Sequence, residues 1–168
     1  MYHQFDDHDR SVWKGAVAGL AAGLAASWVM NQFQAALSKA ITDRPQQQGD
    51  SEDATMKAAE AISETVADQK LTKQEKQTAG PVIHYAFGST IGAAYGALAE
   101  VAPRTTTGWG VPFGAAVWLG ADEIAVPAFG LSKSPFESPV STHASALAAH
   151  VVYGLTTDVV RRLVRAAL

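Results

Sequence analysis

Charged side chains are absent from four long stretches of the chain. Residues 15–38, 77–99, 105–121 and 138–157 contain no Asp, Glu, Lys or Arg. A helix of about 20 residues crosses the roughly 30 Å hydrocarbon core of a bilayer. We therefore predict four transmembrane helices, at about residues 12–37, 80–102, 109–129 and 141–160.

The segment at about residues 39–78 is polar and separates the first predicted span from the second. Ser51, followed by acidic residues, predicts the start of a short amphipathic helix, and the Gly-Pro pair at 80–81 predicts the start of the second span. The amphipathic helix would carry a thin apolar stripe, formed by Met56, Ala59, Ile62 and Val66. This stripe could dock on a partner or on the bilayer surface, or the helix could simply cover the bundle.

Small residues recur every four positions within the predicted spans. Such spacing lets neighbouring helices approach closely where lipid provides no hydrophobic drive for association. The expected packing positions are Gly15, Gly19 and Gly23 in the first span, Gly88, Gly92 and Gly96 in the second, and Gly110 and Gly114 in the third. The pattern predicts an all-α fold, a multi-pass bundle of about four Gly- and Ala-rich helices forming one domain over residues 1–168.

Composition narrows the classes of function. Hydrophobic residues make up 48% and charged residues 17% of the chain, so a single domain can bury a substantial core. The formal net charge of −3 gives no basic footprint for nucleic acid, and the absence of cysteine excludes disulfides and thiol chemistry. The acidic N-terminus is unlike a cleavable signal peptide, so the first span is expected to remain as an anchor.

A mean hydropathy of +0.02 would also suit a soluble alanine-rich bundle. Helices of such a bundle should show a charged face, which the four charge-free stretches lack. The low mean hydropathy follows instead from the polar segment and from spans built of Ala and Gly. The lipid bilayer is therefore the expected partner.

Ionisable residues inside a membrane tend to face protein or water and are often functional. Asp122, Glu123 and His150 are expected at depth, whereas His84 and His143, with Glu100 and Asp158, fall near span ends. His143, His150 and Asp158 share one helical face, which we expect to point inward. The cluster of Asp122, Glu123 and His150 with His84 or His143 could move protons or a cation, or sense acid; it could equally be a structural bond fixing helix order.

Other chemistry finds less support in the sequence. Paired histidines on different spans, such as His84 with His143 or His150, could ligate haem, and Asp122, Glu123 and His150 could hold a metal, but no motif spacing singles out either site. There is no GxSxG, P-loop or dinucleotide fingerprint. We therefore expect no enzyme activity, no cofactor and no metal.

Three segments, HYAFGSTIGAAYGALAE, GWGVPFGAAVWLGADEIAVPAFGLSKSP and HASALAAHVVYGLTTDVVRRLVR, resemble the YagU-like family of bacterial inner-membrane proteins. The resemblance covers roughly residues 80–165. It implies a small multi-pass inner-membrane protein of unknown activity with a link to acid resistance, and it supplies no catalytic residue.

Two functions remain open from the sequence. The chain could serve acid or ion homeostasis through its polar cluster, or it could be a non-catalytic accessory subunit of a homo-oligomer or larger membrane complex. The arginines at 161, 162 and 165 favour cytoplasmic termini.

Overall fold

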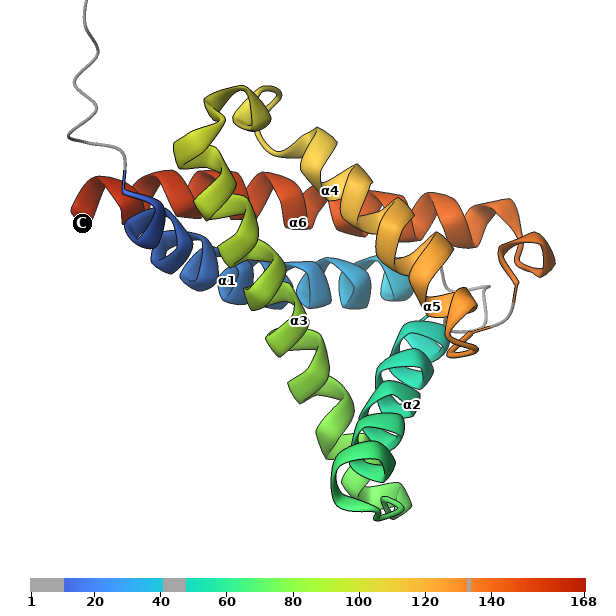
Figure 1. Ribbon diagram of the computed structural model, residues 1–168. Coiled ribbons are helices and arrows are strands. Elements are labelled where there is room, and N and C mark those ends of the chain that lie inside the picture. Colours follow the sequence, from blue (N-terminus) through green and yellow to red (C-terminus); the bar gives the residue numbers. More distant parts are fainter. Residues whose placement is uncertain (1–10, 41–47, 133) are drawn as a thin grey trace, which may run out of the picture.

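The computed structural model describes residues 11–40, 48–132 and 134–168, and within these ranges the chain forms helices and no strand. The all-helical prediction is therefore confirmed. Figure 1 shows the arrangement of these helices, in which α4, η3 and α5 follow one another as a single rod. In chain order the elements are α1 (Val12–Ala40), α2 (Gln48–Ala67), α3 (Lys73–Val101), η2 (Pro103–Thr106), α4 (Val111–Val117), η3 (Trp118–Ala125), α5 (Val126–Ala128), η4 (Pro135–Glu137) and α6 (Val140–Ala167).

Helices α1 and α3 run antiparallel and touch through their backbones. Three glycine pairs face each other across this interface: Gly15 with Gly96, Gly19 with Gly92, and Gly23 with Gly88. A Cβ on any of the three α1 glycines would fall within 3.0 Å of a carbonyl oxygen of α3. The four-residue spacing therefore brings the two helices closer than any side chain would permit.

Helix α6 packs against α1 and also against α4. At the second interface, Gly110 and Gly114 of the third predicted span lie against the backbone of Gly154 and His150. Gly110 precedes α4 with φ of 78°, a left-handed conformation that glycine adopts without steric cost. Both glycine interfaces lie within the chain.

Helix α3 begins earlier than the Gly-Pro pair indicated. Its first residue is Lys73, because Thr72 forms a capping box with Glu75. The Thr72 hydroxyl accepts a bond from the Glu75 N–H at 3.3 Å, and the Glu75 carboxylate accepts one from the Thr72 N–H at 2.7 Å. The Glu75 carboxylate also accepts a bond from the Thr72 hydroxyl at 2.7 Å, and the two bonds that it accepts, that from the Thr72 N–H first, lower the pKa of Glu75. Pro81 consequently lies inside the helix instead of at its start.

The first turns of α3, up to Pro81, pair with α2 in an arm that leaves the bundle (Figure 1). Lys76 and Glu60 form an ion pair across the arm at 2.6 Å. The amphipathic helix of the polar segment is thus present, yet Ile62 and Val66 of its stripe are 50% and 81% exposed. Packing on α3 instead of across the bundle leaves this end of the stripe uncovered.

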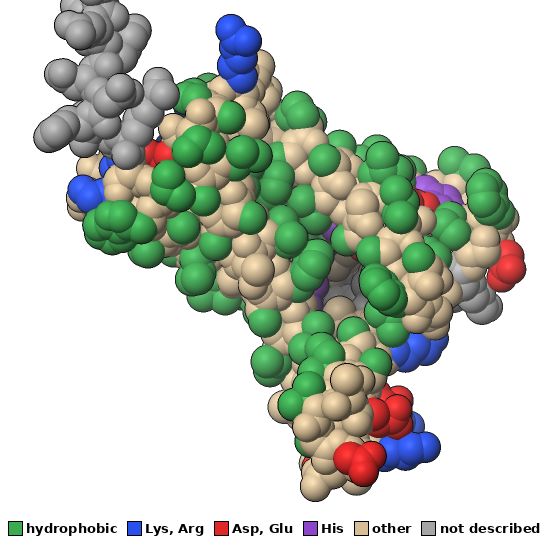
Figure 2. Space-filling model, in the orientation of Figure 1, with side chains coloured by type: hydrophobic (Ala, Val, Ile, Leu, Met, Phe, Trp, Pro, Cys, Tyr) green, Lys and Arg blue, Asp and Glu red, His purple; other side chains and the backbone are tan. Residues whose placement is uncertain are grey.

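The core of this protein is built of small side chains, and the large apolar side chains lie on the surface, whereas a globular protein usually buries its large apolar side chains. The buried hydrophobic residues are alanines together with Met30, Tyr95 and Tyr153, and Thr157 and Asp158 are fully buried. Large apolar side chains point outward, among them Trp13, Leu20, Leu24, Trp28, Val82, Phe87, Leu98, Trp109, Leu119, Ile124 and Leu163. Figure 2 shows hydrophobic side chains over the bundle, with charged side chains at its ends and at the tip of the arm.

Among the described residues, one helix is long and apolar enough to cross a membrane. This helix is α1, with a mean hydropathy of 1.3 over its window of 18 residues. The predicted spans within α3 and α6 contain histidine, tyrosine, glycine and threonine, which lower their hydropathy. Hydropathy by itself therefore indicates a single candidate membrane helix.

Candidate functional site

Asp122 and Glu123 lie on η3, a π-helix in the middle of the rod formed by α4, η3 and α5. In an α-helix, consecutive side chains point about 100° apart. The wider turn of a π-helix reduces this angle, so both carboxylates can face the same neighbour. That neighbour is α6, which carries His143 and His150.

The Glu123 and His143 side chains form the tighter of the two pairs. Their Oε1 and Nδ1 atoms are 2.6 Å apart, and the side chains are 16% and 25% exposed. His143 Nε2 lies 3.0 Å from the main-chain oxygen of Pro135. Because that oxygen can only accept, Nε2 carries a hydrogen, and one further proton must be shared between Nδ1 and Oε1. The pair can exist as imidazolium with carboxylate or as imidazole with carboxylic acid.

The Asp122 and His150 side chains are also brought together, but more loosely. His150 Nδ1 lies 3.0 Å from the carbonyl oxygen of Ala146, to which it donates, and 3.6 Å from Asp122 Oδ2. The second distance is too long for a hydrogen bond. Asp122 therefore interacts with His150 through charge, and only when the imidazole is protonated.

His84 of α3 completes the group and interacts electrostatically with His150. Its Nε2 atom is buried and has no hydrogen-bond partner, and the same is true of Nε1 of Trp118, the first residue of η3. The structure thus links the five residues of the predicted polar cluster, among the seven ionisable residues that the sequence singled out, through two histidine–carboxylate pairs and the interaction of His84 with His150. We call them the histidine cluster, consisting of His84, Asp122, Glu123, His143 and His150.

A second polar group lies farther along α6 and was underestimated from the sequence. Asp158, expected near water at a span end, is fully buried. Its Oδ1 accepts bonds from the Tyr95 hydroxyl and from Arg161, each at 3.0 Å, and its Oδ2 accepts one from Arg162 at 2.8 Å. The arginines three and four residues after Asp158 could have suggested this pairing, whereas Tyr95 gave no signal. We call Tyr95, Asp158, Arg161 and Arg162 the Asp158 network.

Glu100 extends the charged end of the bundle. Its carboxylate accepts a bond from Arg165 at 2.8 Å and one from the main-chain N–H of Ser11 at 3.2 Å. Arg162 also stacks over the Trp109 ring at 5.0 Å. These contacts join the start of α1, the end of α3 and the last turns of α6.

The two polar groups have different chemical capacities. The Asp158 network holds carboxylate and guanidinium groups in fixed pairs, and arginine does not release its proton near neutral pH. The histidine cluster holds groups that exchange protons near neutral pH. Within residues 11–40, 48–132 and 134–168, no group of three or more His, Asp or Glu is placed to hold a metal ion. The histidine cluster brings imidazole and carboxylate groups within reach of each other, as in the pair of Glu123 and His143.

Comparison with known proteins gives one match. The model of a family described as a protein of unknown function (DUF1440) matches residues 44–159. No curated protein and no solved structure matches the chain. The matched range includes the whole histidine cluster and the glycines of α3 and α4, but not those of α1.

Proposed function

The chain belongs to the DUF1440 family of proteins of unknown function, and from this premise we propose that it is a multi-pass inner-membrane protein that moves or senses protons through its histidine cluster. Its resemblance to the YagU-like proteins, in residues 118–127 and 150–162, adds a bacterial setting and a link to acid resistance. The proposal has two parts, membrane insertion and proton exchange, and each has its own test.

The distribution of side-chain size supports membrane insertion. In water, burying large apolar side chains drives folding, and a core of alanine and glycine surrounded by Trp, Leu and Phe would forgo most of that free energy. In lipid no such penalty applies, and close backbone contact becomes the main source of helix association. Glycine contacts inside and large apolar residues outside are what a bilayer favours.

We expect the expressed chain to sediment with membranes, to resist an alkaline carbonate wash and to require detergent for extraction. The exposed apolar surface of α1, α3 and α6 would otherwise be in contact with water. Recovery of a folded, monodisperse protein from the soluble fraction without detergent would overturn the membrane proposal.

The pair of Glu123 and His143, with its single shared proton, is the observation that carries the proton proposal. A proton can pass between Nδ1 and Oε1 without movement of either ring or carboxylate. His84 Nε2 and Trp118 Nε1 are buried and have no partner among the described residues, whereas buried polar atoms normally have one, so each can bond a water or a proton carrier that enters the cluster. Water and two histidine–carboxylate pairs are sufficient parts for a proton relay.

Near-isosteric substitutions separate proton exchange from structural pairing. We expect Glu123→Gln, Asp122→Asn and His150→Gln to keep the thermal melting temperature within a few degrees while abolishing a pH-driven proton flux in proteoliposomes. Each change retains size and hydrogen bonding but removes titration. Glu64→Gln on the arm is the matched control and should leave flux unchanged.

A purely structural cluster predicts a different pattern. Flux would then be absent in the parent protein or unaltered in every variant, and Ala replacements, which leave a partner unsatisfied, would destabilise the fold by about 1 to 3 kcal/mol. That pattern would remove the proton proposal and favour the accessory role in a homo-oligomer or larger complex. Since the glycine rows are occupied within the chain, such assembly would have to use the outer apolar surface.

A further inference from the structure

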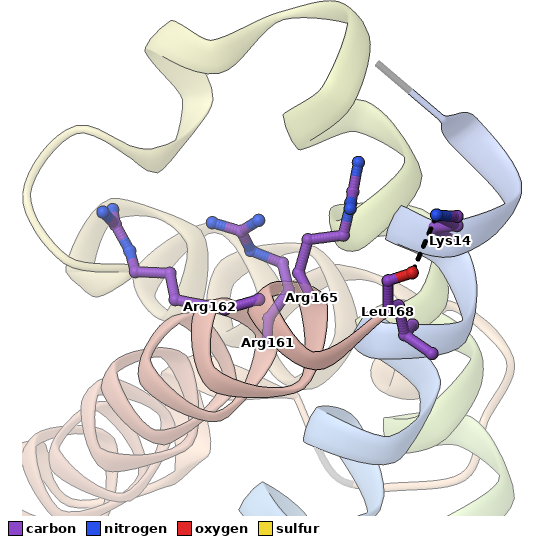
Figure 3. A pocket seen from close by; sticks show the side chains of 6 residues that line it. Lys14, Arg161, Arg162, Arg165 and Leu168 are labelled. Atoms are coloured by element: carbon purple, nitrogen blue, oxygen red, sulfur yellow. Dashed lines mark hydrogen bonds between the residues drawn. The ribbon is translucent and has the colours of Figure 1, made fainter. Parts of the chain in front are cut away.

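Four basic side chains gather at the end of the bundle where α1 begins and α6 ends. They line an open pocket of about 560 Å³, which we call the basic pocket. Its lining residues are Lys14, Arg161, Arg162, Arg165, Ala166 and Leu168. Figure 3 shows the three arginines in a row along the last turns of α6, with Lys14 beside them on α1. The start of α1 and the end of α6, which are far apart in the sequence, thus line the same pocket with cationic side chains.

Within the described residues, the basic pocket has four cationic side chains and two side-chain carboxylates that contact them. Among the described residues, the side-chain carboxylates bonded to these cations are those of Asp158 and Glu100. Lys14 Nζ instead donates to the main-chain oxygen of Leu168 at 2.7 Å. Arg161 is 7% exposed, and its Nε has no hydrogen-bond partner. Arg161 is therefore held inside the bundle, whereas Lys14 and Arg162, whose side chain is 43% exposed, can reach an anion.

The surroundings of the basic pocket indicate which anion. Trp13 and Trp109 are 64% and 61% exposed, and each lies beside a pocket cation: Lys14 is 5.9 Å from the Trp13 ring and Arg162 is 5.0 Å from the Trp109 ring. Exposed tryptophan at the end of an apolar helix is typical of the interface between hydrocarbon and head groups. With α1 placed across a bilayer, as proposed above, the cations at its end would lie at the depth of lipid phosphates.

We propose that the basic pocket binds the phosphodiester head group of an anionic phospholipid. This inference rests on the proposed membrane location but not on proton exchange. Arg162 has donor hydrogens beyond those that bond Asp158 and Thr106, and Lys14 supplies a point charge at the rim. A zwitterionic head group would bring its own cation into the same space and bind less well.

The test uses the full chain in mild detergent, with lipid binding followed by native mass spectrometry. We expect phosphatidylglycerol to bind at least tenfold more tightly than phosphatidylcholine. Lys14→Gln and Arg162→Gln should each weaken phosphatidylglycerol binding by about fivefold, as expected for one cation near an anionic lipid, and the double variant by more. Arg104→Gln, which removes a cation from the same end of the bundle but outside the pocket, is the matched control.

Several outcomes would overturn the proposal. Equal binding of the two lipids, or an equal loss in Arg104→Gln, would show that the pocket does not select head groups. Inorganic phosphate at millimolar concentration that displaces the lipid fully would identify a site for free phosphate instead. A protein that needs no detergent would refute the membrane location and the head-group site together, whereas a folded membrane protein without lipid selectivity would refute the head-group site alone.

Discussion

Replacing Gly19 or Gly92 by alanine is expected to destabilise the protein by about 3 kcal/mol, and replacement by leucine to prevent folding. At Gly19 a new Cβ would fall within 3.0 Å of the Gly92 carbonyl oxygen, and at Gly92 it would collide with the carbonyl of Gly19. Backbone atoms cannot rotate away as side chains can, so α1 and α3 would have to separate. Thermal melting in detergent, followed by circular dichroism, measures the loss.

Gly120→Ala is the matched control for this prediction. Gly120 also lies inside a helix, but nothing within 4 Å would meet its Cβ. Alanine should be neutral there, or stabilising by about 0.5 to 1 kcal/mol because it restricts the unfolded chain. Unchanged melting of both the Gly19 and Gly92 alanine variants would contradict the close packing of α1 on α3.

The second large effect is expected at Asp158. Asp158→Asn should cost about 3 kcal/mol, since it leaves the buried Arg161 charged beside a neutral group, whereas Arg162, whose side chain is 43% exposed, keeps its contact with water. The cost arises from the unpaired Arg161, because the Tyr95 hydroxyl can still donate to the amide oxygen. The melting temperature of the variant in detergent provides the measurement.

Asp68→Asn serves as the control for Asp158→Asn. Asp68 is exposed, with a positive φ of 51° that asparagine also tolerates, so this variant should melt like the parent. If Asp158→Asn melted like Asp68→Asn, the network would contribute nothing measurable to stability. A variant lacking Asp158, Arg161 and Arg162 together should recover part of the loss, because no charge would then be left unpaired.

The glycine rows were readable from the sequence because packing helices need small residues at a fixed spacing. Which row faces which was not readable, since Gly15, Gly88 and Gly110 begin equivalent patterns. The Gly80-Pro81 pair predicts too late a start for α3, which begins instead after the capping box of Thr72 and Glu75. The capping box satisfies two N–H groups at the start of α3, and the helix continues through Pro81 although that residue removes a backbone hydrogen bond.

The membership of the histidine cluster was predicted from the rarity of ionisable residues in apolar stretches. Its geometry depends on the π-helix, which no local pattern announced, because an extra residue per turn is decided by what the rod packs against. The burial of Asp158 likewise depends on another helix. Tyr95 of α3 covers Asp158, which would lie near the surface if α6 stood alone. Contacts between helices that are far apart in the sequence cannot be read from either segment alone.

Helix α3 belongs both to the bundle, where it packs on α1, and to the arm, where it packs on α2. Its 29 residues form a rod about 44 Å long, held by α1 along its later turns and reaching out to the arm with its first. Pro81 cannot donate the hydrogen bond that would brace this rod, so its point of least bending stiffness lies where arm and bundle meet. His84 lies within one turn of that flexure. A movement of the arm that bends α3 at Pro81 therefore displaces the adjacent turn, which carries His84 of the histidine cluster.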